Sequence, residues 1–485
     1  MVPADGGGTS PFAVRTSPRD NSMRKVTPAG VKRSDLPRTR VFIDCTPTSL
    51  YGGRTGIQRV IRNLVAVAHE AGEHEQVDCV PVVHDGKRFY QVVAPLQQLA
   101  TASADAKPET NAVTSAIQRG ALKVRSRLRK LFVPKRWFLA WKARQEQRLL
   151  WRQRPTGSAL KFRASDVLLM ADAGWGLPAP EPLAAVRESG CRVGFLSYDI
   201  IPLRSQQFCP PLAVEVFQRW LENLLPQVDF AVAISRKSQA DLDEYLRDHG
   251  TRLHSLRKRL GNFPLGMKLD ECDTSGPIRP HVREAMAASG GAKPFLIVCT
   301  VEPRKNHALL LDAFETVRQR IPHAKVCIVG RYGWASEQIV ERMTSHPEYG
   351  RGLHWLSDLG DTELDYCYRH AGAFVFPSLY EGFGLPIVES LCHGLTTLVS
   401  DIPAHHEVGR DFCRYFSPQS AGELAQLMLG CLGVEPLPPV RPITEFQPVE
   451  WLDSARHLLR ECLRLAGAAS APDADLARPP FAGAA

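Results

Sequence analysis

Short apolar runs alternate with helix-like stretches along most of the chain. Runs rich in β-branched and aromatic residues and bounded by turn residues are typical of buried strands. A first set covers 40–46, 77–83, 166–172, 191–199 and 229–235. A second set covers 294–302, 324–330, 352–358, 373–378 and 395–401. Because strands that alternate with helices form parallel sheets covered on both faces, the pattern predicts an α/β protein with two Rossmann-like lobes.

The same pattern divides the chain into segments. Residues 1–38 and 468–485 are rich in small, polar or proline residues and lack apolar periodicity, so we expect two disordered tails. Between them we expect an N-terminal lobe at 39–277 and a C-terminal lobe at 278–446. The helix-like stretch at 447–467 is expected to pack back on the N-terminal lobe.

Composition agrees with two globular domains, because the 485 residues are 44% hydrophobic and 23% charged. The twelve cysteines are scattered, without a Cys-x-x-Cys pair or zinc-ligand spacing, which favours a reducing compartment. We find no apolar run of membrane-spanning length and no signal-peptide pattern in the first forty residues. The expected location is therefore the cytoplasm.

The segment FVFPSLYEGFGLPIVESLCHG (374–394) is the most informative one. It reads as a buried strand, a loop with Glu381, and a helix that opens near Pro386. A helix N-terminus that follows glycines exposes backbone N–H groups and suits a pyrophosphate. Glu381 and Glu389 would both face the carboxyl end of the strands, where ligands bind in open α/β sheets. Because carboxylates repel phosphate, we assign both glutamates to sugar hydroxyls.

A second loop, VEPRKNH (301–307), places Arg304 and Lys305 directly after a predicted strand. Arginine offers two parallel hydrogen bonds to phosphate, and lysine offers a compact charge. Alone, this loop would be read as a solvated basic turn. Together with the glutamate segment it favours a phosphate-bearing ligand.

Glu-x7-Glu within EGFGLPIVES, together with VEPRKNH, resembles the retaining glycosyltransferases of family four, which have the GT-B fold. The resemblance covers most of 40–465 and implies an active-site cleft between an N-terminal acceptor domain and a C-terminal nucleotide-sugar domain. It also implies that Glu389 binds the nucleotide ribose, that Glu381 contacts the donor sugar, and that Arg304 and Lys305 neutralise the diphosphate. We expect the neighbouring loop residues to contact the donor as well, namely Gly382, Phe383, Gly384 and Leu385.

The N-terminal lobe resembles the same family through YGGRTGIQR (51–59) and SYDIIPL (197–203). Gly53 and Gly56 are expected to let the backbone meet donor phosphate, with Arg59 nearby. Asp199 follows a predicted strand and is a catalytic candidate. Many relatives have a histidine where this chain has Tyr198, so the identity of a catalytic base stays open.

The resemblance implies retention of anomeric configuration. Two carboxylates joined by a glycine turn need not reach the roughly 5 Å spacing of a retaining glycosidase pair. We therefore expect a front-face substitution in which the departing diphosphate helps to deprotonate the acceptor. No metal or cofactor is expected, because Asp241 and Asp243 lie in a helix-like stretch and read as solvated charges.

A basic insertion at 115–154 carries a charge of +12, which exceeds the net charge of +9, so the rest of the chain is close to −3. Residues 119–154 contain thirteen Lys or Arg but a single acidic residue, Glu146, and they include Trp137, Trp141 and Trp151. Such segments are typical of helices on anionic membranes. The alternative is a helical excursion packed on the first lobe. Nucleic acid is not expected, because no nucleic-acid-binding motif accompanies the charge.

These inferences converge on a hexosyltransferase of bacterial surface-polysaccharide synthesis. The expected donor is GDP-mannose, and the expected acceptor is a saccharide or a lipid-linked saccharide at the inner face of the cytoplasmic membrane. The alternative is a catalytically silent GT-B scaffold in a membrane-associated assembly complex.

Overall fold

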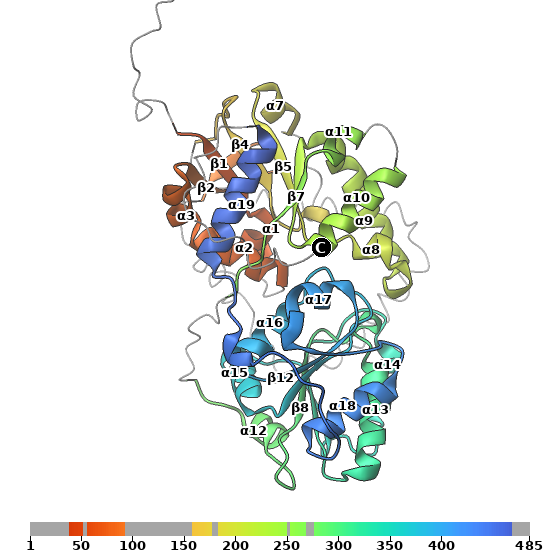
Figure 1. Cartoon of the computed structure of the whole chain (residues 1–485). Helices are drawn as coiled ribbons and strands as arrows, with labels where there is room; N and C mark the ends of the chain where they lie inside the picture. Colours follow the sequence, from red (N-terminus) through yellow and green to blue (C-terminus); the bar gives the residue numbers. More distant parts are fainter. Residues whose placement is uncertain are drawn as a thin grey trace, which may run out of the picture. The chain divides into compact units, whose positions relative to one another are not determined.

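The computed structural model describes residues 38–51, 56–92, 158–176, 183–249, 253–267 and 276–467. They form two α/β units, each built around its own sheet (Figure 1). Gly53, the basic insertion at 115–154, the C-terminal tail and nearly all of the N-terminal tail lie outside the described residues.

The first sheet has seven strands in the order β3-β2-β1-β4-β5-β6-β7. Their bounds are β1 (Arg40–Asp44), β2 (Asp78–His84), β3 (Phe89–Gln91), β4 (Val167–Met170), β5 (Arg192–Ser197), β6 (Phe230–Ala233) and β7 (Leu260–Asn262). All neighbours are parallel except β2 and β3. β4 and β6 are buried along their whole length, as expected for parallel strands covered on both faces.

The second sheet has six parallel strands in the order β10-β9-β8-β11-β12-β13. Their bounds are β8 (Phe295–Val298), β9 (Val326–Val329), β10 (Leu353–Leu356), β11 (Ala373–Phe376), β12 (Thr396–Ser400) and β13 (Arg414–Phe416). β8 and β11 are neighbours, with Phe374 opposite Leu296. The loops that follow these two strands therefore emerge side by side at the same edge of the sheet.

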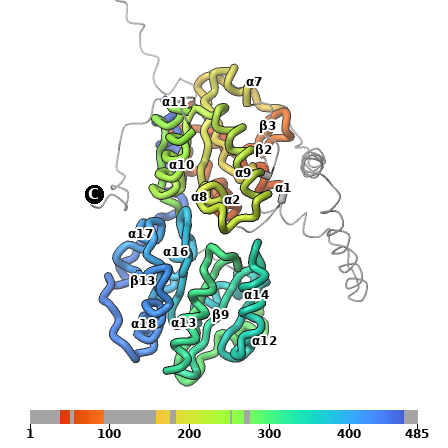
Figure 2. The backbone as a smooth tube through the Cα atoms, turned by 90° about the vertical axis from the view of Figure 1, so that its right-hand side faces the viewer, coloured from red at the N-terminus to blue at the C-terminus, as the bar shows by residue number. Residues whose placement is uncertain are grey.

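Helices cover both sheets. Those near the first sheet are α1 (Thr46–Tyr51), α2 (Gly56–Ala66), α3 (Ala68–Glu75), α7 (Leu183–Glu188), α8 (Ile201–Arg204), α9 (Pro211–Leu224), α10 (Arg236–Asp248) and α11 (His254–Arg257). Those near the second sheet are α12 (Pro280–Met286), α13 (His307–Arg320), α14 (Glu337–Thr344), α15 (Asp361–His370), α16 (Leu385–Cys392), α17 (Pro403–Gly409) and α18 (Ala421–Cys431). α13 packs against α18, and the two lie side by side in Figure 1 and Figure 2. α13 buries Leu310, Phe314 and Val317 at helical spacing.

The last helix, α19 (Trp451–Ala466), follows the second sheet in sequence but packs on α3, β6 and β7 of the first. Arg456 and Arg460 both donate to the buried carboxylate of Glu75, at 3.0 and 2.6 Å. Ser454 adds a hydrogen bond from its hydroxyl to the carbonyl of Pro264. The second unit of the chain is thus tied back to the first by a helix with a buried apolar face.

The two mainly parallel sheets, covered by helices, confirm the predicted α/β class. All ten predicted runs contain a strand. The sequence did not predict β3, β7 and β13, which are three residues long and lie at sheet edges. An edge strand pairs on one side only and is often short, so its sequence carries little of the apolar pattern.

Candidate functional site

The loop between β11 and α16 holds the glutamate and glycines at 381–384, called the EGFG loop below. Gly384 has φ 118°, in the region that glycine adopts without strain, and it directly precedes Leu385, the first residue of α16. Pro386 lies in the first helical turn, where its missing N–H is not needed. The N-terminus of α16 therefore opens at the carboxyl edge of the second sheet, an arrangement that suits an anion.

Glu381 is the centre of a buried charge cluster. Its Oε2 lies 2.7 Å from Arg304 Nη1, and its Oε1 lies 2.5 Å from Lys305 Nζ. The side chains of these three residues are only 9%, 14% and 11% exposed. Lys305 also lies over the ring of Phe376, 4.9 Å from its centroid. The structure thus brings together one carboxylate and two positively charged side chains, which come from loops after neighbouring strands.

The charges in this cluster fix each other's ionisation. Burial alone would raise the pKa of Glu381, but the charges of Arg304 and Lys305 outweigh it and hold the pKa well below its usual range. Burial alone would lower the pKa of Arg304, but Glu381 and Glu302 raise it above its usual value. The Glu381 carboxylate and the Arg304 guanidinium therefore stay charged at neutral pH.

Arg304 also joins the two loops through the backbone. Its Nη1 donates to the carbonyl of Tyr380 at 2.5 Å, and its own carbonyl accepts from the N–H of Leu379 at 2.9 Å. Its Nη2 donates to Glu302 at 2.6 Å. The loop after β8 and the loop after β11 consequently form one bonded unit, and its cations are held in fixed positions.

Glu389, on α16, is buried and already has two hydrogen-bond donors. Arg59 Nη1 lies 2.5 Å from its Oε1, and the hydroxyl of Tyr368 donates to its Oε2 at 2.6 Å. Arg59 lies on α2, so this ion pair links a helix of the first sheet to a helix of the second. A ligand hydroxyl that binds Glu389 must share or replace one of these donors.

Gly382 touches the first unit of the chain. Its carbonyl accepts from the hydroxyls of Ser235 at 2.6 Å and Ser238 at 3.1 Å. A Cβ added to Gly382 would lie 2.8 Å from the carbonyl oxygen of Tyr198 and 3.0 Å from the Cβ of Asp199. Only glycine allows this approach, which places Asp199 beside the EGFG loop.

Asp199 and Tyr198 have different surroundings. Burial raises the pKa of Asp199, although Arg304 acts in the opposite direction, and its Oδ1 accepts from the N–H of Ile201 at 3.1 Å. Tyr198 is buried, and its hydroxyl donates to the carbonyl of Ala171 at 2.9 Å. Tyr198 therefore points into the first unit.

The remaining predicted residues fall near these groups. Gly56 begins α2, and a Cβ added to it would lie 3.7 Å from Cδ1 of Leu385. Phe383 is buried in the core beside the loop. The backbone of Gly56 thus lies close to the start of α16, together with Arg59 from the same helix.

One expectation was wrong. Asp241 is not a solvated charge, because it is 3% exposed and accepts from the hydroxyl of Tyr380 at 2.6 Å. Lys237 bonds to both groups and lies 4.4 Å from the centroid of the Tyr380 ring. Tyr380 comes from the loop after β11, a contact that a helical pattern in α10 cannot reveal. Asp243 is half-buried and pairs with Arg247 and Arg257.

Sequence reasoning also missed Tyr368, Glu302 and the serine pair Ser235 and Ser238. Ser235 gave a signal, since serine before a helix is a common N-cap, and its hydroxyl does accept from the N–H of Ser238. The sequence around Tyr368 gives no such signal, because the contact of Tyr368 with Glu389 depends on the packing of α15 against α16. Within the described ranges, no group of three or more metal-binding side chains is present.

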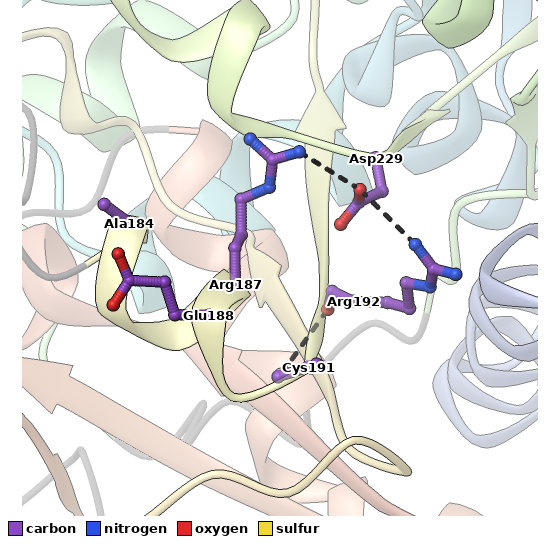
Figure 3. A pocket seen from close by; sticks show the side chains of 7 residues that line it. Ala184, Arg187, Glu188, Cys191, Arg192 and Asp229 are labelled. Atoms are coloured by element: carbon purple, nitrogen blue, oxygen red, sulfur yellow. Dashed lines mark hydrogen bonds and ion pairs between the residues drawn. The ribbon is translucent and has the colours of Figure 1, made fainter.

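A pocket of about 490 Å³ lies at the opposite, amino-terminal ends of β5 and β6. Figure 3 shows Arg187 and Arg192 extending toward Asp229, with N–O distances of 3.6 and 3.7 Å. Both arginines are about half exposed. This pocket contains none of the predicted site residues, and we assign the candidate site to the carboxyl edge on chemical grounds.

Known proteins share sequence with part of this chain. Residues 279–430 match the family described as "Glycosyl transferases group 1". The chain is 29% identical over 317 residues to the serotype-specific mannosyltransferase WbdA of Escherichia coli, which covers 64% of this chain and 38% of that protein. It is 37% identical over 123 residues to the O-antigen chain mannosyltransferase B of Escherichia coli, covering 24% of this chain and 30% of the relative. The matched region thus spans well under half of either relative.

Among solved structures, the sucrose-phosphate synthase of Thermosynechococcus elongatus aligns with a TM-score of 0.49 and 14% identity, covering 89% of this chain and 94% of that one. No helix in the described part of the chain is long and apolar enough to span a membrane.

The family match covers β8 through most of α18, and it includes Arg304, Lys305, Glu381 and Glu389. Residues 279–430 are therefore similar to the glycosyl transferases group 1 family.

Proposed function

We propose that the chain is a retaining, metal-independent hexosyltransferase that moves mannose from GDP-mannose to a saccharide or a lipid-linked saccharide in bacterial surface-polysaccharide synthesis. The observation that carries the proposal is the pair of cations, Arg304 and Lys305, held by Glu381 at strand ends in the region similar to the glycosyl transferases group 1 family. The choice of mannose rests on the names of the relatives, several of which are mannosyltransferases.

The cations would receive the donor diphosphate. Glu381 and Glu302 already balance the two positive charges, so no unpaired positive charge is buried before the donor arrives. A diphosphate adds negative charge on the open side of the same cations and faces the N-terminus of α16. Arg304 can offer phosphate a second N–H group while its other contacts keep the loop in place.

The two glutamates would bind hydroxyl groups. Because its pKa is held low, Glu381 stays an acceptor and cannot serve as the acid that protonates a leaving group. Glu389 shares its oxygens with Arg59 and Tyr368. A ribose diol can replace the Arg59 contact on Glu389, and that exchange would release the guanidinium toward the diphosphate.

In the transfer step, the bond between the sugar C1 and the diphosphate oxygen breaks, and its electron pair stays on the diphosphate. The acceptor hydroxyl attacks C1 from the same face, and its proton passes to the departing diphosphate. Arg304, Lys305 and the α16 N-terminus stabilise the developing charge. A well-placed group of this kind contributes about 3 to 4 kcal/mol.

Asp199 is a second candidate for the proton, since it lies beside Gly382 and its pKa is raised by burial. If Asp199 takes the proton, Asp199→Asn removes the acidic limb of the pH–rate profile. If the diphosphate takes it, the variant keeps the profile and changes only the rate.

The test is turnover by the purified full chain with a panel of nucleotide sugars. We expect free GDP to be released from GDP-mannose when a mannose-terminated acceptor is present, with no loss of rate in EDTA. Proton NMR of the product should show the anomeric configuration of the donor. Nucleotide binding without turnover for every donor and acceptor would favour the silent scaffold and overturn the proposal.

Two arginine variants distinguish the effect of a site cation from the general effect of removing a positive charge. Arg304→Ala should lower the rate of GDP release at least 100-fold. Arg351→Ala should leave it unchanged, because Arg351 lies at the amino-terminal side of β10 and its side chain is 72% exposed. Equal rates for the two variants would show that the cations do not act on the donor.

A further inference from the structure

The first two turns of α10 carry polar side chains on their buried face. Ser235 is the N-cap, and Ser238 and Asp241 follow at intervals of three residues, which places all three on one side of the helix. Their exposed fractions are only 2%, 1% and 3%. Further along the helix the buried residues include Leu242 and Leu246. Because a buried polar group is costly unless it is hydrogen-bonded, the partners of the three polar side chains indicate what this end of the helix does.

The two serines bind the residue that follows Glu381. The carbonyl of Gly382 accepts from the hydroxyls of Ser235 at 2.6 Å and Ser238 at 3.1 Å. Ser235 still caps the helix, because its hydroxyl oxygen accepts from the N–H of Ser238 at 2.9 Å. A Cβ added to Gly382 would lie 3.1 Å from Oγ of Ser238. The backbone of the EGFG loop therefore lies directly against the start of α10.

Asp241 binds the residue that precedes Glu381. Its Oδ2 accepts from the hydroxyl of Tyr380 at 2.6 Å. Lys237, one turn before Asp241, pairs with Asp241 and donates to the same hydroxyl at 2.8 Å. Burial raises the pKa of Tyr380 and Asp241 raises it further, so the phenol stays protonated at neutral pH. The carbonyl of Tyr380 accepts from Arg304 at 2.5 Å, so this residue connects α10 with one of the site cations.

The start of α10 is itself fixed to the second unit. α10 packs against α17, and the two helices lie close together in Figure 2. Glu407 on α17 accepts from the backbone N–H groups of Arg236 and Lys237, at 2.8 and 3.1 Å. N–H groups in a first helical turn have no partner within the helix, and the helix dipole favours a carboxylate there. The side chain of Glu407 is only 11% exposed. This carboxylate therefore holds the start of α10 beside the EGFG loop.

We propose that the serine pair and Asp241 of α10 are positioning residues for Glu381 in the sugar transfer. This inference rests on the proposed function, because it assumes that Glu381 contacts the donor sugar. The ion pairs of Glu381 hold the end of its side chain, whereas a loop with two glycines leaves the backbone many conformations. The bonds from α10 fix that backbone both before and after Glu381. Such support affects the rate strongly, because a misplacement of about 1 Å can lower it by about 100-fold.

The experiment measures the release of GDP from GDP-mannose by the full chain, the Kd for GDP by calorimetry, and the melting temperature. We expect Tyr380→Phe, Asp241→Ala and Ser238→Ala each to lower kcat about 10- to 100-fold. The Kd for GDP should stay near the wild-type value, because GDP lacks the sugar that Glu381 contacts. Tyr380→Phe keeps the aromatic ring and leaves the ion pair between Lys237 and Asp241 in place, so this variant tests the contact in a folded protein.

Further variants separate positioning from a general effect of changing α10. Asp241→Asn should keep most of the kcat, because its amide oxygen can still accept from the phenol of Tyr380. Asp243→Ala is the matched control on the same helix, where Asp243 is 29% exposed and pairs with Arg247 and Arg257. It should keep the kcat and the Kd of the wild type. The double variant Tyr380→Phe/Asp241→Ala should be no slower than the slower single variant, because both changes remove the same contact.

Each other outcome overturns the inference. Unchanged kcat in Tyr380→Phe and Asp241→Ala, with wild-type GDP binding, would leave the proposed function intact and refute the positioning role alone. Equal losses of kcat and GDP affinity, together with lower melting temperatures, would mean that the contacts only support the fold. Losses that multiply in the double variant would show that the two side chains act on separate contacts. If the wild type releases no GDP from GDP-mannose and binds no nucleotide, the proposed function fails together with the positioning role.

Discussion

Replacing Glu381 by glutamine removes one negative charge from a buried cluster and keeps the shape of the side chain. Arg304 and Lys305 then remain at their positions with side chains only 14% and 11% exposed. Glu302 still faces Arg304 at 2.6 Å, whereas the ion pair of Lys305 with Glu381 is lost. The variant therefore leaves a buried ammonium group poorly compensated.

The size of the effect follows from burial. Removing one partner from a buried ion pair costs about 3 to 5 kcal/mol, whereas a surface pair contributes about 1 kcal/mol or less. For a domain of 150 to 250 residues, this corresponds to a melting temperature lower by about 10 °C. Glu435→Gln is the control, since Glu435 pairs with Arg320 at 2.5 Å but these side chains are 35% and 49% exposed.

The contribution of Glu381 to stability should decrease as the pH falls. The pKa of Glu381 is depressed in the folded protein, so its contribution to stability is fully present above the ordinary glutamate pKa of about 4.3. It is lost progressively as the pH falls below that value. The difference in melting temperature between wild type and Glu381→Gln should therefore be largest near pH 7 and shrink toward pH 3.

Differential scanning fluorimetry from pH 7 to pH 3, with and without pyrophosphate, measures these quantities. Pyrophosphate should raise the melting temperature of Glu381→Gln more than that of the wild type, because it supplies the missing negative charge. Equal melting temperatures of Glu381→Gln and the wild type would refute the ion-pair reasoning. A difference in melting temperature that stays constant with pH would refute it as well.

Three further predictions follow from other residues. Glu389→Gln weakens a binding contact, so calorimetry should show a Kd for GDP that is raised about tenfold, with little effect on kcat. Glu381→Gln should instead mainly lower kcat. Equal small effects of the two variants would contradict the assignment of the two glutamates. Burial raises the pKa of Asp44 to about 7, so between about pH 4 and pH 7 ionisation of this carboxyl favours the unfolded chain. The melting temperature of Asp44→Asn should therefore exceed that of the wild type by an amount that grows as the pH rises through this range. A difference in melting temperature that is independent of pH would disprove this reasoning. Deletion of 115–154 should abolish flotation with anionic liposomes, and flotation that persists would exclude the basic insertion as the membrane-binding segment.

The sequence by itself determined the α/β class, because buried parallel strands must be apolar along their length and this leaves a continuous pattern. It also singled out Arg304, Lys305 and Glu381 as candidates, since each lies in a loop after a strand and strand ends gather at one edge. The edge strands β3, β7 and β13 escaped prediction, because pairing on one side imposes a weaker pattern.

Only the tertiary structure decided which of these charges pair. Lys305 and Glu381 are 76 positions apart, and Arg59 and Glu389 are 330 apart. The structure alone shows that Asp241 is buried against Tyr380 and that Tyr198 points into the first unit. Local patterns record whether a position faces core or solvent. They do not record which side chain from a distant element completes its hydrogen bonds, because that partner is set by how helices and sheets pack.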